Sequence, residues 1–366
     1  MDSRQQLRVG VVQAAPAFLD RDATTERACQ LIDDAGRQGV DVLGFPEGFI
    51  PTHPDWYHYL PASSARSFDF ARRLFNNSVE IPGPTTDRLA QAAARARVNV
   101  VIGVCERTPA PDLTLYNTQL FIGSDGRVLG KHQKIMPTLG ERVVHARGGG
   151  EGLRAFETPV ARVSGLICGE NSNPLAIMAL AADRPDIHVA SWPSPVSRDE
   201  GGMTDLIRVA SQSLAYATGA FVLSSQAVVN DEIVSELAQT DGDRTFLGGQ
   251  VGLGSSLIAG PDRAILAGPP DGPWEGILTA DIDLQAVVMA RHVHDFAGHY
   301  NRPDIFSLRV NRGSGPLVEA WDGRDRWTTG ASSAAGDGPA AGEPAADGSP
   351  DGQRTAREAD ATPARG

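Results

Sequence analysis

The sequence predicts an α/β protein built in layers around a mixed sheet. Short valine-rich segments typical of strands alternate with longer segments in which apolar residues recur at helical spacing. Other strand segments follow one another across a tight turn, as around Asp125-Gly126. Strands joined by a helix can run parallel, whereas strands joined by a tight turn run antiparallel, so both kinds of pairing are expected.

The N-terminal half is predicted to hold five strands and two helices. In the first helix, Ala28, Leu31 and Ile32 fall on one face, and Asp20 or Thr24 is its expected cap. The second helix is alanine-rich and begins after a proline. The expected segments are a strand at 7–14, a helix at 21–38, a strand at 41–45, a helix at 85–97, a strand at 99–105 and a hairpin at 116–123 and 127–131.

The C-terminal half repeats this alternation and ends in strands. An extended region comes first, two helix–strand pairs follow, and three strand segments are interpreted as a closing meander. The expected segments are extended at 156–161 and 162–168, helical at 174–182, a strand at 187–192, helical at 203–218, a strand at 220–225, and strands at 256–259, 264–267 and 276–281.

Composition divides the 366 residues into a folded domain and a tail. Residues 1–312 contain nearly all of the apolar periodicity and are predicted to form one catalytic domain. From Gly313 the chain is rich in Gly, Ala, Pro and Asp, and no aromatic residue follows Trp327. Such a segment buries too little apolar surface to offset its ordering entropy. The tail 313–366 is therefore expected to be disordered from about residue 328.

Charge and apolar content exclude two broad classes of partner. The net charge of −12 at pH 7 argues against nucleic acid, because phosphate binding needs a basic face. No apolar run of 18 residues occurs, so a membrane is not an expected partner. The polar start leads directly into a strand, which is not typical of a signal peptide. Three cysteines, a small and odd number, favour reduced thiols and a cytoplasmic location.

A thiol, a carboxylate and an ammonium group each follow an extended segment. Cys168 ends an apolar run, Glu47 follows Phe45-Pro46, and Lys134 follows the predicted hairpin. A thiol attacks as its thiolate and needs a base, which Glu47 can supply, while Lys134 can stabilise negative charge in a transition state. The three residue types together predict covalent catalysis at a carbon bonded to nitrogen, provided that folding brings them together.

Each residue also has an ordinary structural interpretation. Taken alone, Cys168 fits a small buried hydrophobic residue, Glu47 a capping or surface acid, and Lys134 a solvated hairpin end. The other two cysteines, Cys29 on a helix face and Cys105 at a strand end, are predicted to be core residues.

The histidines carry no predicted metal chemistry. His292, His294 and His299 lie close in sequence but lack thiolate or carboxylate partners at matched spacing. Neither a metal nor an organic cofactor is expected.

Four motifs, in this order, resemble the nitrilase family of the carbon–nitrogen hydrolase superfamily, over residues 9–306. The motifs are Phe45-Pro46-Glu47, the run 131–138 with Glu141-Arg142, the run 166–171, and the closing run 295–304. Four ordered matches are far more specific than any single one.

The resemblance implies a role for each matched residue. Glu47 is the implied general base, Lys134 the charge stabiliser and Cys168 the nucleophile, while Glu141 is a second glutamate that positions the lysine or the substrate. The implied fold is a four-layer α-β-β-α sandwich that forms homodimers or larger homo-oligomers without a cofactor. The implied reaction converts a nitrile to the carboxylic acid and ammonia through a cysteine thioimidate and thioester.

Two other functions remain open. An amidase of the same superfamily would use the same residues on a small amide. A non-catalytic, partner-binding protein on the same scaffold would have a vestigial site, and the complete set of Glu47, Lys134 and Cys168 argues against it.

Five further residues are candidates for the substrate pocket. Gly169 stands where many nitrilases carry Trp, and it leaves more room beside the thiol. His53, Trp56 and Tyr57 belong to an aromatic insertion that either shapes the pocket mouth or packs as a surface loop. Trp192 follows a strand whose end is expected near the cysteine.

Overall fold

A computed structural model describes residues 5–198, 202–313, 319–321 and 326–328 of the chain. Contacts divide the chain into two units, Met1–Ser314 and Gly315–Gly366. In the second unit, β13 (Glu319–Trp321) and β14 (Arg326–Thr328) form an antiparallel pair. Residues 329–366, which carry the predicted disorder, lie outside the described residues, and the domain boundary at 312 stays a prediction.

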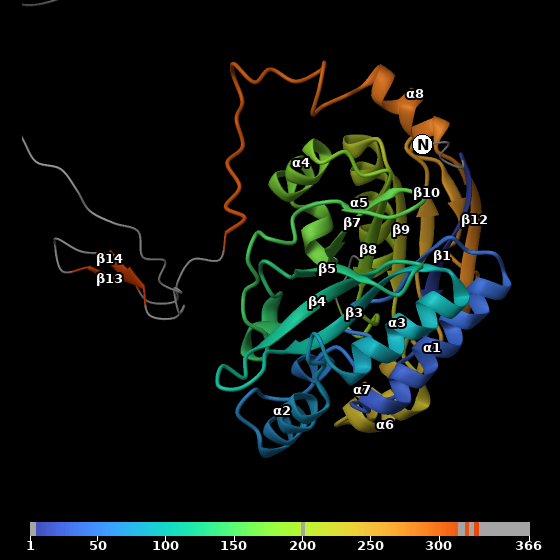
Figure 1. Cartoon of the computed structure of the whole chain (residues 1–366). Helices are drawn as coiled ribbons and strands as arrows, with labels where there is room; N and C mark the ends of the chain where they lie inside the picture. Colours follow the sequence, from blue (N-terminus) through green and yellow to red (C-terminus); the bar gives the residue numbers. More distant parts are fainter. Residues whose placement is uncertain (1–4, 199–201, 314–318, 322–325, 329–366) are drawn as a thin grey trace, which may run out of the picture. The chain divides into compact units, whose positions relative to one another are not determined.

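The larger unit holds two six-stranded mixed sheets (Figure 1). In the first sheet β2 pairs in parallel with β1 and β3, while the other neighbours are antiparallel. Its order is β12 (Gly276–Asp283), β1 (Gln6–Gln13), β2 (Val42–Gly44), β3 (Asn99–Arg107), β4 (Leu115–Ile122) and β5 (Val128–Gln133).

The second sheet has a parallel centre and antiparallel edges. Strands β7, β8 and β9 run parallel to one another. The order is β11 (Ile265–Ala267), β10 (Leu257–Ala259), β9 (Phe221–Gln226), β8 (Ile187–Trp192), β7 (Arg162–Ile167) and β6 (Phe156–Glu157).

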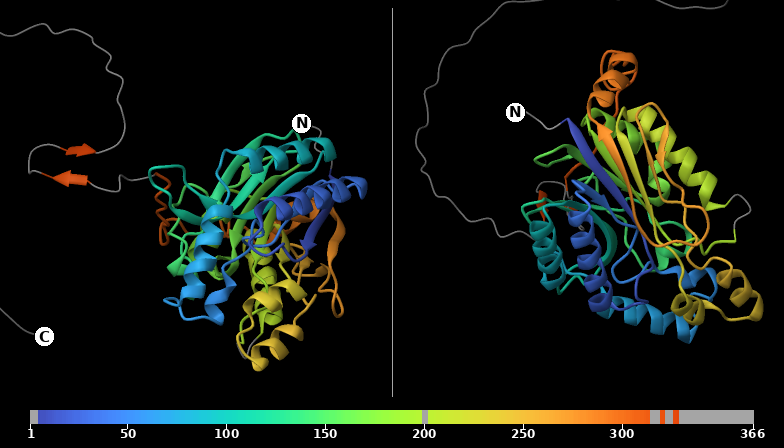
Figure 2. Two further views of the ribbon diagram at one scale, coloured as in Figure 1. Left: turned by 90° about the horizontal axis from the view of Figure 1, so that it is seen from below. Right: turned by 90° about the vertical axis from the view of Figure 1, so that its right-hand side faces the viewer.

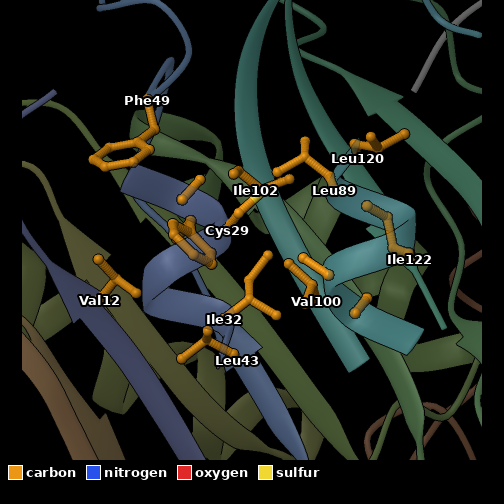
Figure 3. Close-up of a cluster of buried hydrophobic side chains, with 14 of the residues drawn as sticks. Val12, Cys29, Ile32, Leu43, Phe49, Leu89, Val100, Ile102, Leu120 and Ile122 are labelled. Atoms are coloured by element: carbon orange, nitrogen blue, oxygen red, sulfur yellow. The ribbon is translucent and has the colours of Figure 1, made fainter. Parts of the chain in front are cut away.

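Two helices cover the outer face of the first sheet. Helix α1 (Arg21–Arg37) is capped by Asp20, which accepts a 2.9 Å hydrogen bond from the Ala23 amide, and α3 (Pro84–Ala96) begins at a proline. Their apolar faces meet alternate residues of the strands, as Figure 3 shows for Ile32 and Val100. Cys29 is part of this cluster, which confirms its predicted place in the core.

The two sheets pack face to face, and two more helices cover the second sheet. Because strand side chains alternate, Val9 and Val11 of β1 face the second sheet while Val12 faces the helices. Helices α4 (Pro174–Ala182) and α5 (Met203–Thr218) pack on the outer face of β7–β9. Figure 2 shows α1 and α3 on one side of the strands and α5 on the other. The predicted four-layer sandwich is confirmed.

Two parts of the prediction need correction. The closing meander is wrong, because β10 and β11 complete the second sheet whereas β12 crosses to the first and pairs with β1. Within the described part of the chain, four α-helices were not predicted: α2 (Ala65–Asn77), α6 (Asp231–Leu237), α7 (Asp241–Gly248) and α8 (Gln285–Val293). Among the described residues, no helix has the length and apolar character needed to cross a membrane.

Candidate active site

One cavity of about 160 Å³ brings together all four residues predicted to be catalytic. Glu47, Lys134, Glu141 and Cys168 all line it. Glu47 follows β2 and Lys134 follows β5, both in the first sheet, whereas Cys168 follows β7 in the second. The cavity therefore lies where ends of strands from the two sheets meet.

Close packing against β3 fixes the backbone at Glu47. The Glu47 amide donates a 3.2 Å hydrogen bond to the carbonyl of Trp192 in the second sheet. A Cβ at Gly103 would lie 2.2 Å from the Pro46 carbonyl oxygen and 2.9 Å from the Glu47 Cα. Only glycine allows this approach, so β3 positions the glutamate through a missing side chain.

A buried hydrogen-bond network joins the lysine to both glutamates. Lys134 Nζ lies 2.7 Å from Glu47 Oε1 and 2.6 Å from Glu141 Oε2. Asn117 Nδ2 donates a 2.7 Å hydrogen bond to each of the same two carboxylates. Glu141, in η2 (Leu139–Val143), also accepts from the Thr138 amide at 2.9 Å.

The two carboxylates differ in how fully they are paired. Both oxygens of Glu141 have partners, since His145 Nδ1 lies 3.2 Å from Oε1. Oε2 of Glu47 is buried and has no hydrogen-bond partner among the described residues. Glu141 is therefore suited to hold Lys134, whereas Glu47 keeps one oxygen free to exchange a proton.

Cys168 occupies a sharp turn from β7 into η3 (Cys168–Ser172). Its φ of +53° lies in the left-handed region, which a non-glycine residue adopts only when its surroundings impose it. Asn171 Nδ2 donates a 2.9 Å hydrogen bond to the Cys168 carbonyl and thereby supports the turn. The turn brings Cys168 to the end of a buried strand, where it lines the cavity.

Glu170 ties the cysteine turn to the lysine segment. One of its oxygens accepts a 2.7 Å hydrogen bond from the Ile135 amide, next to Lys134. The other accepts from the Ile167 amide at 3.0 Å, next to Cys168, and lies 2.9 Å from His132 Nε2. A single buried carboxylate thus links the segment after β5 to the end of β7 at the site.

Burial and charge set the protonation of the thiol and its base. Burial and the Glu47 charge raise the pKa of Cys168 to about 12, against the opposing effects of Lys134 and the Gly169 amide. Burial also raises the pKa of Glu47, although Lys134 opposes it. Burial alone would lower the pKa of Lys134, but Glu47 and the other nearby anions raise it. Cys168 therefore rests as a thiol, and attack requires that its proton move to a base.

The five predicted pocket residues lie in different surroundings. His53 lines the cavity. Trp56 is fully buried against Phe70, and the ring of Tyr57 lies beside that of Trp56 at a tilt of 41°. Trp192 is fully buried in the cluster under α4 and α5. A Cβ built at Gly169 meets no atom within 4 Å, so the space beside the nucleophile is open. A substrate contact for these residues stays a prediction.

Sequence reasoning missed several residues of the site. Asn117 in β4 bridges the two glutamates, and Asp55 in η1 (Asp55–His58) lies 2.6 Å from His53 Nδ1. Asn117 begins a run of three polar residues, Asn117-Thr118-Gln119, inside a strand with apolar ends, and this run was an available signal. The apolar wall of the cavity was also missed; it comprises Leu139, Pro193, Val196, Met203 and Leu206.

One group of side chains among the described residues has the spacing of a metal site. Ligand atoms of Glu47, His53 and Glu141 lie within 4.8 Å of one another. However, the Lys134 ammonium group already contacts an oxygen of each carboxylate. A metal ion would have to compete with this buried cation, so the group is better described as an ion-pair network.

Sequence comparison matches the carbon-nitrogen hydrolase family to residues 8–292. The chain belongs to the carbon–nitrogen hydrolase family. One relative of this hydrolase, "Nitrilase 2" from an unknown prokaryotic organism, is 37% identical over 87% of the chain and 96% of its own length. A "Nitrilase" from Pseudomonas syringae pv. syringae is 36% identical over 86% of the chain and 93% of its own length.

Solved structures support the same fold for this carbon–nitrogen hydrolase. A carbon-nitrogen hydrolase from Helicobacter pylori G27 aligns over 82% of the chain and 97% of its own length, with a TM-score of 0.65 and 18% identity. The family membership predicted from four short motifs is confirmed, and the chain is an enzyme of the nitrilase type by its relatives.

Proposed function

We propose that this carbon–nitrogen hydrolase converts an organic nitrile to the carboxylic acid and ammonia. The observation that supports this proposal most strongly is that Cys168, Lys134 and the unpartnered oxygen of Glu47 meet in one cavity. Nitrilases at 36–37% identity over nearly their whole length support the choice of a nitrile. Glu47 is the proposed base, Cys168 the nucleophile, Lys134 the charge stabiliser and Glu141 the residue that holds Lys134.

The first half of the proposed reaction forms a thioimidate. The Cys168 sulfur adds to the nitrile carbon, and its proton passes to Glu47 Oε2, the oxygen without another partner. The nitrogen gains negative charge as one C–N π bond breaks, and the Lys134 ammonium stabilises it. Glu47 then returns the proton to that nitrogen, so the carboxylate is restored.

The second half consumes two water molecules. Water adds to the thioimidate carbon while Glu47 takes one of its protons and passes it to the nitrogen, which gives a tetrahedral intermediate with a hydroxyl and an amino group. Glu47 then transfers the hydroxyl proton to the nitrogen as the C–N bond breaks, so ammonia leaves and the carbonyl of a thioester forms. The thioester that remains is attacked by a second water, again deprotonated by Glu47, and the acid and the free thiol are released. If the tetrahedral intermediate loses the sulfur instead of the nitrogen, the product is the amide.

A substrate panel with product identification tests the proposal. The purified protein is offered nitriles of increasing size and the matching amides, and ammonia, acid and amide are measured. Release of acid from nitriles supports the proposal, whereas turnover of the amides alone would assign the protein as an amidase. Cys168→Ala should fold, as judged by circular dichroism, and lose all turnover; an active variant would refute the assignment of the nucleophile.

Labelling of the thiol separates an enzyme from an inert scaffold. Cys29 is 8% exposed and Cys105 is 0% exposed, whereas Cys168 is less buried. An electrophile should therefore modify Cys168 first, and peptide mass spectrometry identifies the modified residue. A thiol that stays unmodified while the protein turns over no nitrile or amide would favour a binding protein.

The assembly and location of the chain are also proposals. Apolar side chains on the outer faces of α4 and α5 are exposed, among them Leu175 at 65% and Val209 at 62%. We propose that these helices pair between copies in a homodimer or larger homo-oligomer. The change Val209→Glu should reduce the mass measured by light scattering. All three thiols are free, which supports the proposed cytoplasmic location.

A further inference from the structure

His53 lies between a carboxylate that holds it and two carboxylates of the active site. Its Nδ1 is 2.6 Å from Asp55 Oδ1, and its side chain is 12% exposed. Its Nε2 is buried without a hydrogen-bond partner among the described residues. This atom faces Glu47 Oε1 at 3.5 Å and Glu141 Oε2 at 3.9 Å.

This geometry favours a proton on each ring nitrogen. At 2.6 Å from a carboxylate, Nδ1 must carry a proton in order to donate it. A neutral ring would then direct the lone pair of Nε2 at the two carboxylates, which is repulsive. A protonated Nε2 instead directs positive charge at both. The pKa of His53 is consistent with this charge. Burial alone would lower the pKa, but Asp55 and then Glu47 raise it to about 10.

The charges around Glu47 show what this cation contributes. The groups that face His53 come from several elements and are mostly acidic: Asp55 of η1, Glu47 after β2, Glu141 of η2, Lys134 after β5, and His145 after η2. Three carboxylates therefore share the site with one lysine. Burial and the charge of Glu141 raise the pKa of Glu47, while Lys134 and then His53 lower it. Loss of the imidazolium at His53 would therefore favour a protonated Glu47, which cannot act as a base.

We propose that His53, held as a cation by Asp55, is a positioning residue that keeps Glu47 in its carboxylate form at the pH of catalysis. This rests on the proposed role of Glu47 as the base. His53 touches Glu47 rather than the reacting atoms, so its effect is on the pH at which the base works. The role differs from that of Lys134. The Lys134 ammonium group also contacts Glu47, but its proposed role is to stabilise the negative charge on the substrate nitrogen.

The pH profile of kcat/KM tests the proposal. On the acid side, activity is lost as Glu47 gains a proton, so removal of a neighbouring positive charge must move this limb to higher pH. In His53→Asn the limb should move up by about one pH unit or more. His53→Lys, which keeps a charge near Asp55, should restore at least half of the shift. The matched control is His292→Asn, which replaces an exposed histidine of α8 and should leave the profile unchanged.

A double-variant experiment separates this role from a structural one. Glu47→Gln removes the carboxylate that is proposed to titrate and, with it, turnover, so in this background the acid limb is read from the labelling of Cys168. Adding His53→Asn to Glu47→Gln should then produce no further shift of that limb. The rate at which iodoacetamide alkylates Cys168, followed by peptide mass spectrometry, gives a second profile that does not depend on nitrile turnover. If the protein hydrolyses no nitrile, the proposed function fails, yet this labelling profile still tests His53.

Two results would overturn the inference. One is an unmoved acid limb in a folded His53→Asn variant, in turnover and in labelling alike. The other is an equal shift in the Glu47→Gln background, because His53 would then act on some group other than Glu47.

Discussion

Asn117 donates a 2.7 Å hydrogen bond from Nδ2 to Oε1 of Glu47, and this bond leaves Oε2 as the only unpartnered oxygen of that carboxylate among the described residues. The same nitrogen donates to Glu141. One neutral amide in β4 thereby fixes the orientation of both glutamates and decides which oxygen of Glu47 can take the proton.

Replacing Asn117 by Leu should damage catalysis more than folding. The side chain keeps its approximate volume but loses two hydrogen bonds to carboxylates, each worth about 1.5–3 kcal/mol. We expect kcat to fall by about 10- to 100-fold, because Glu47 is no longer held with Oε2 free. Thr118→Val, at the next position of the strand and bonded to Glu106 instead, is the control. Equal losses of kcat in both variants would contradict the assignment.

The Gly103→Ala change should inactivate the enzyme while most of the fold survives. The added Cβ would lie 2.9 Å from the Glu47 Cα, so the segment that carries the base must move. Turnover should fall by about 100-fold or more, with far-UV circular dichroism unchanged. Gly248→Ala, where a Cβ meets nothing within 4 Å, should keep full activity. A fully active Gly103→Ala protein would show that the position of Glu47 tolerates a shift of this size.

Adding bulk at Gly169 should narrow the range of substrates. The position is open, so Gly169→Ala and Gly169→Trp are both expected to fold with an unchanged melting temperature. Because the residue adjoins the nucleophile, the tryptophan should lower kcat/KM for the bulkiest nitriles of a size series by about tenfold or more, and alanine by less. An equal loss for all substrates would indicate that the change disturbs the turn rather than the pocket.

The buried His188 should make the protein less stable as the pH falls below neutrality. Its Nε2 lies 2.9 Å from Asn171 Oδ1 and its Nδ1 lies 2.9 Å from Ser164 Oγ, an arrangement that suits a neutral ring. Burial, with the charge of His132, lowers its pKa from 6.5 to about 3. The unfolded chain therefore binds the proton first, and the free energy of unfolding falls between pH 6.5 and 3 by up to about 1.4 kcal/mol per pH unit.

Urea unfolding at pH 7, 6 and 5 measures this effect, when the free energy of unfolding of the natural chain is compared with that of His188→Gln. The variant lacks the titrating group, so its stability deficit relative to the natural chain should shrink as the pH falls. His292→Asn, which changes an exposed histidine, should follow the natural chain at every pH. A deficit that stays constant would mean that His188 does not titrate in this range.

Local patterns predicted the elements whose signals lie within a few residues. Helix α4 begins and ends where expected, because Asn173 caps it and Pro174 occupies its first turn. Helix α2 was missed although Ser64 caps it and Phe70 and Leu74 lie on its buried face, so this segment does carry local helix signals.

Long-range pairing was beyond the sequence patterns. The strand character of β12 is visible locally, but its partner β1 lies at the other end of the domain, so nothing nearby indicates which sheet it joins. The same reason separates the predicted site residues from the missed ones. Cys168 and Glu47 end buried strands, whereas Asn117 gains its role only when β4 and β5 pair and bring it beside Lys134.

The base and the nucleophile are contributed by different sheets, with Glu47 after β2 and Cys168 after β7. Neither half of the sandwich can be competent alone, because a chain with one sheet formed has either a thiol without a base or a base without a thiol. Turnover therefore reports on the packing of the two sheets against each other. Mild denaturation that loosens this contact should abolish activity while the helices and strands are still formed.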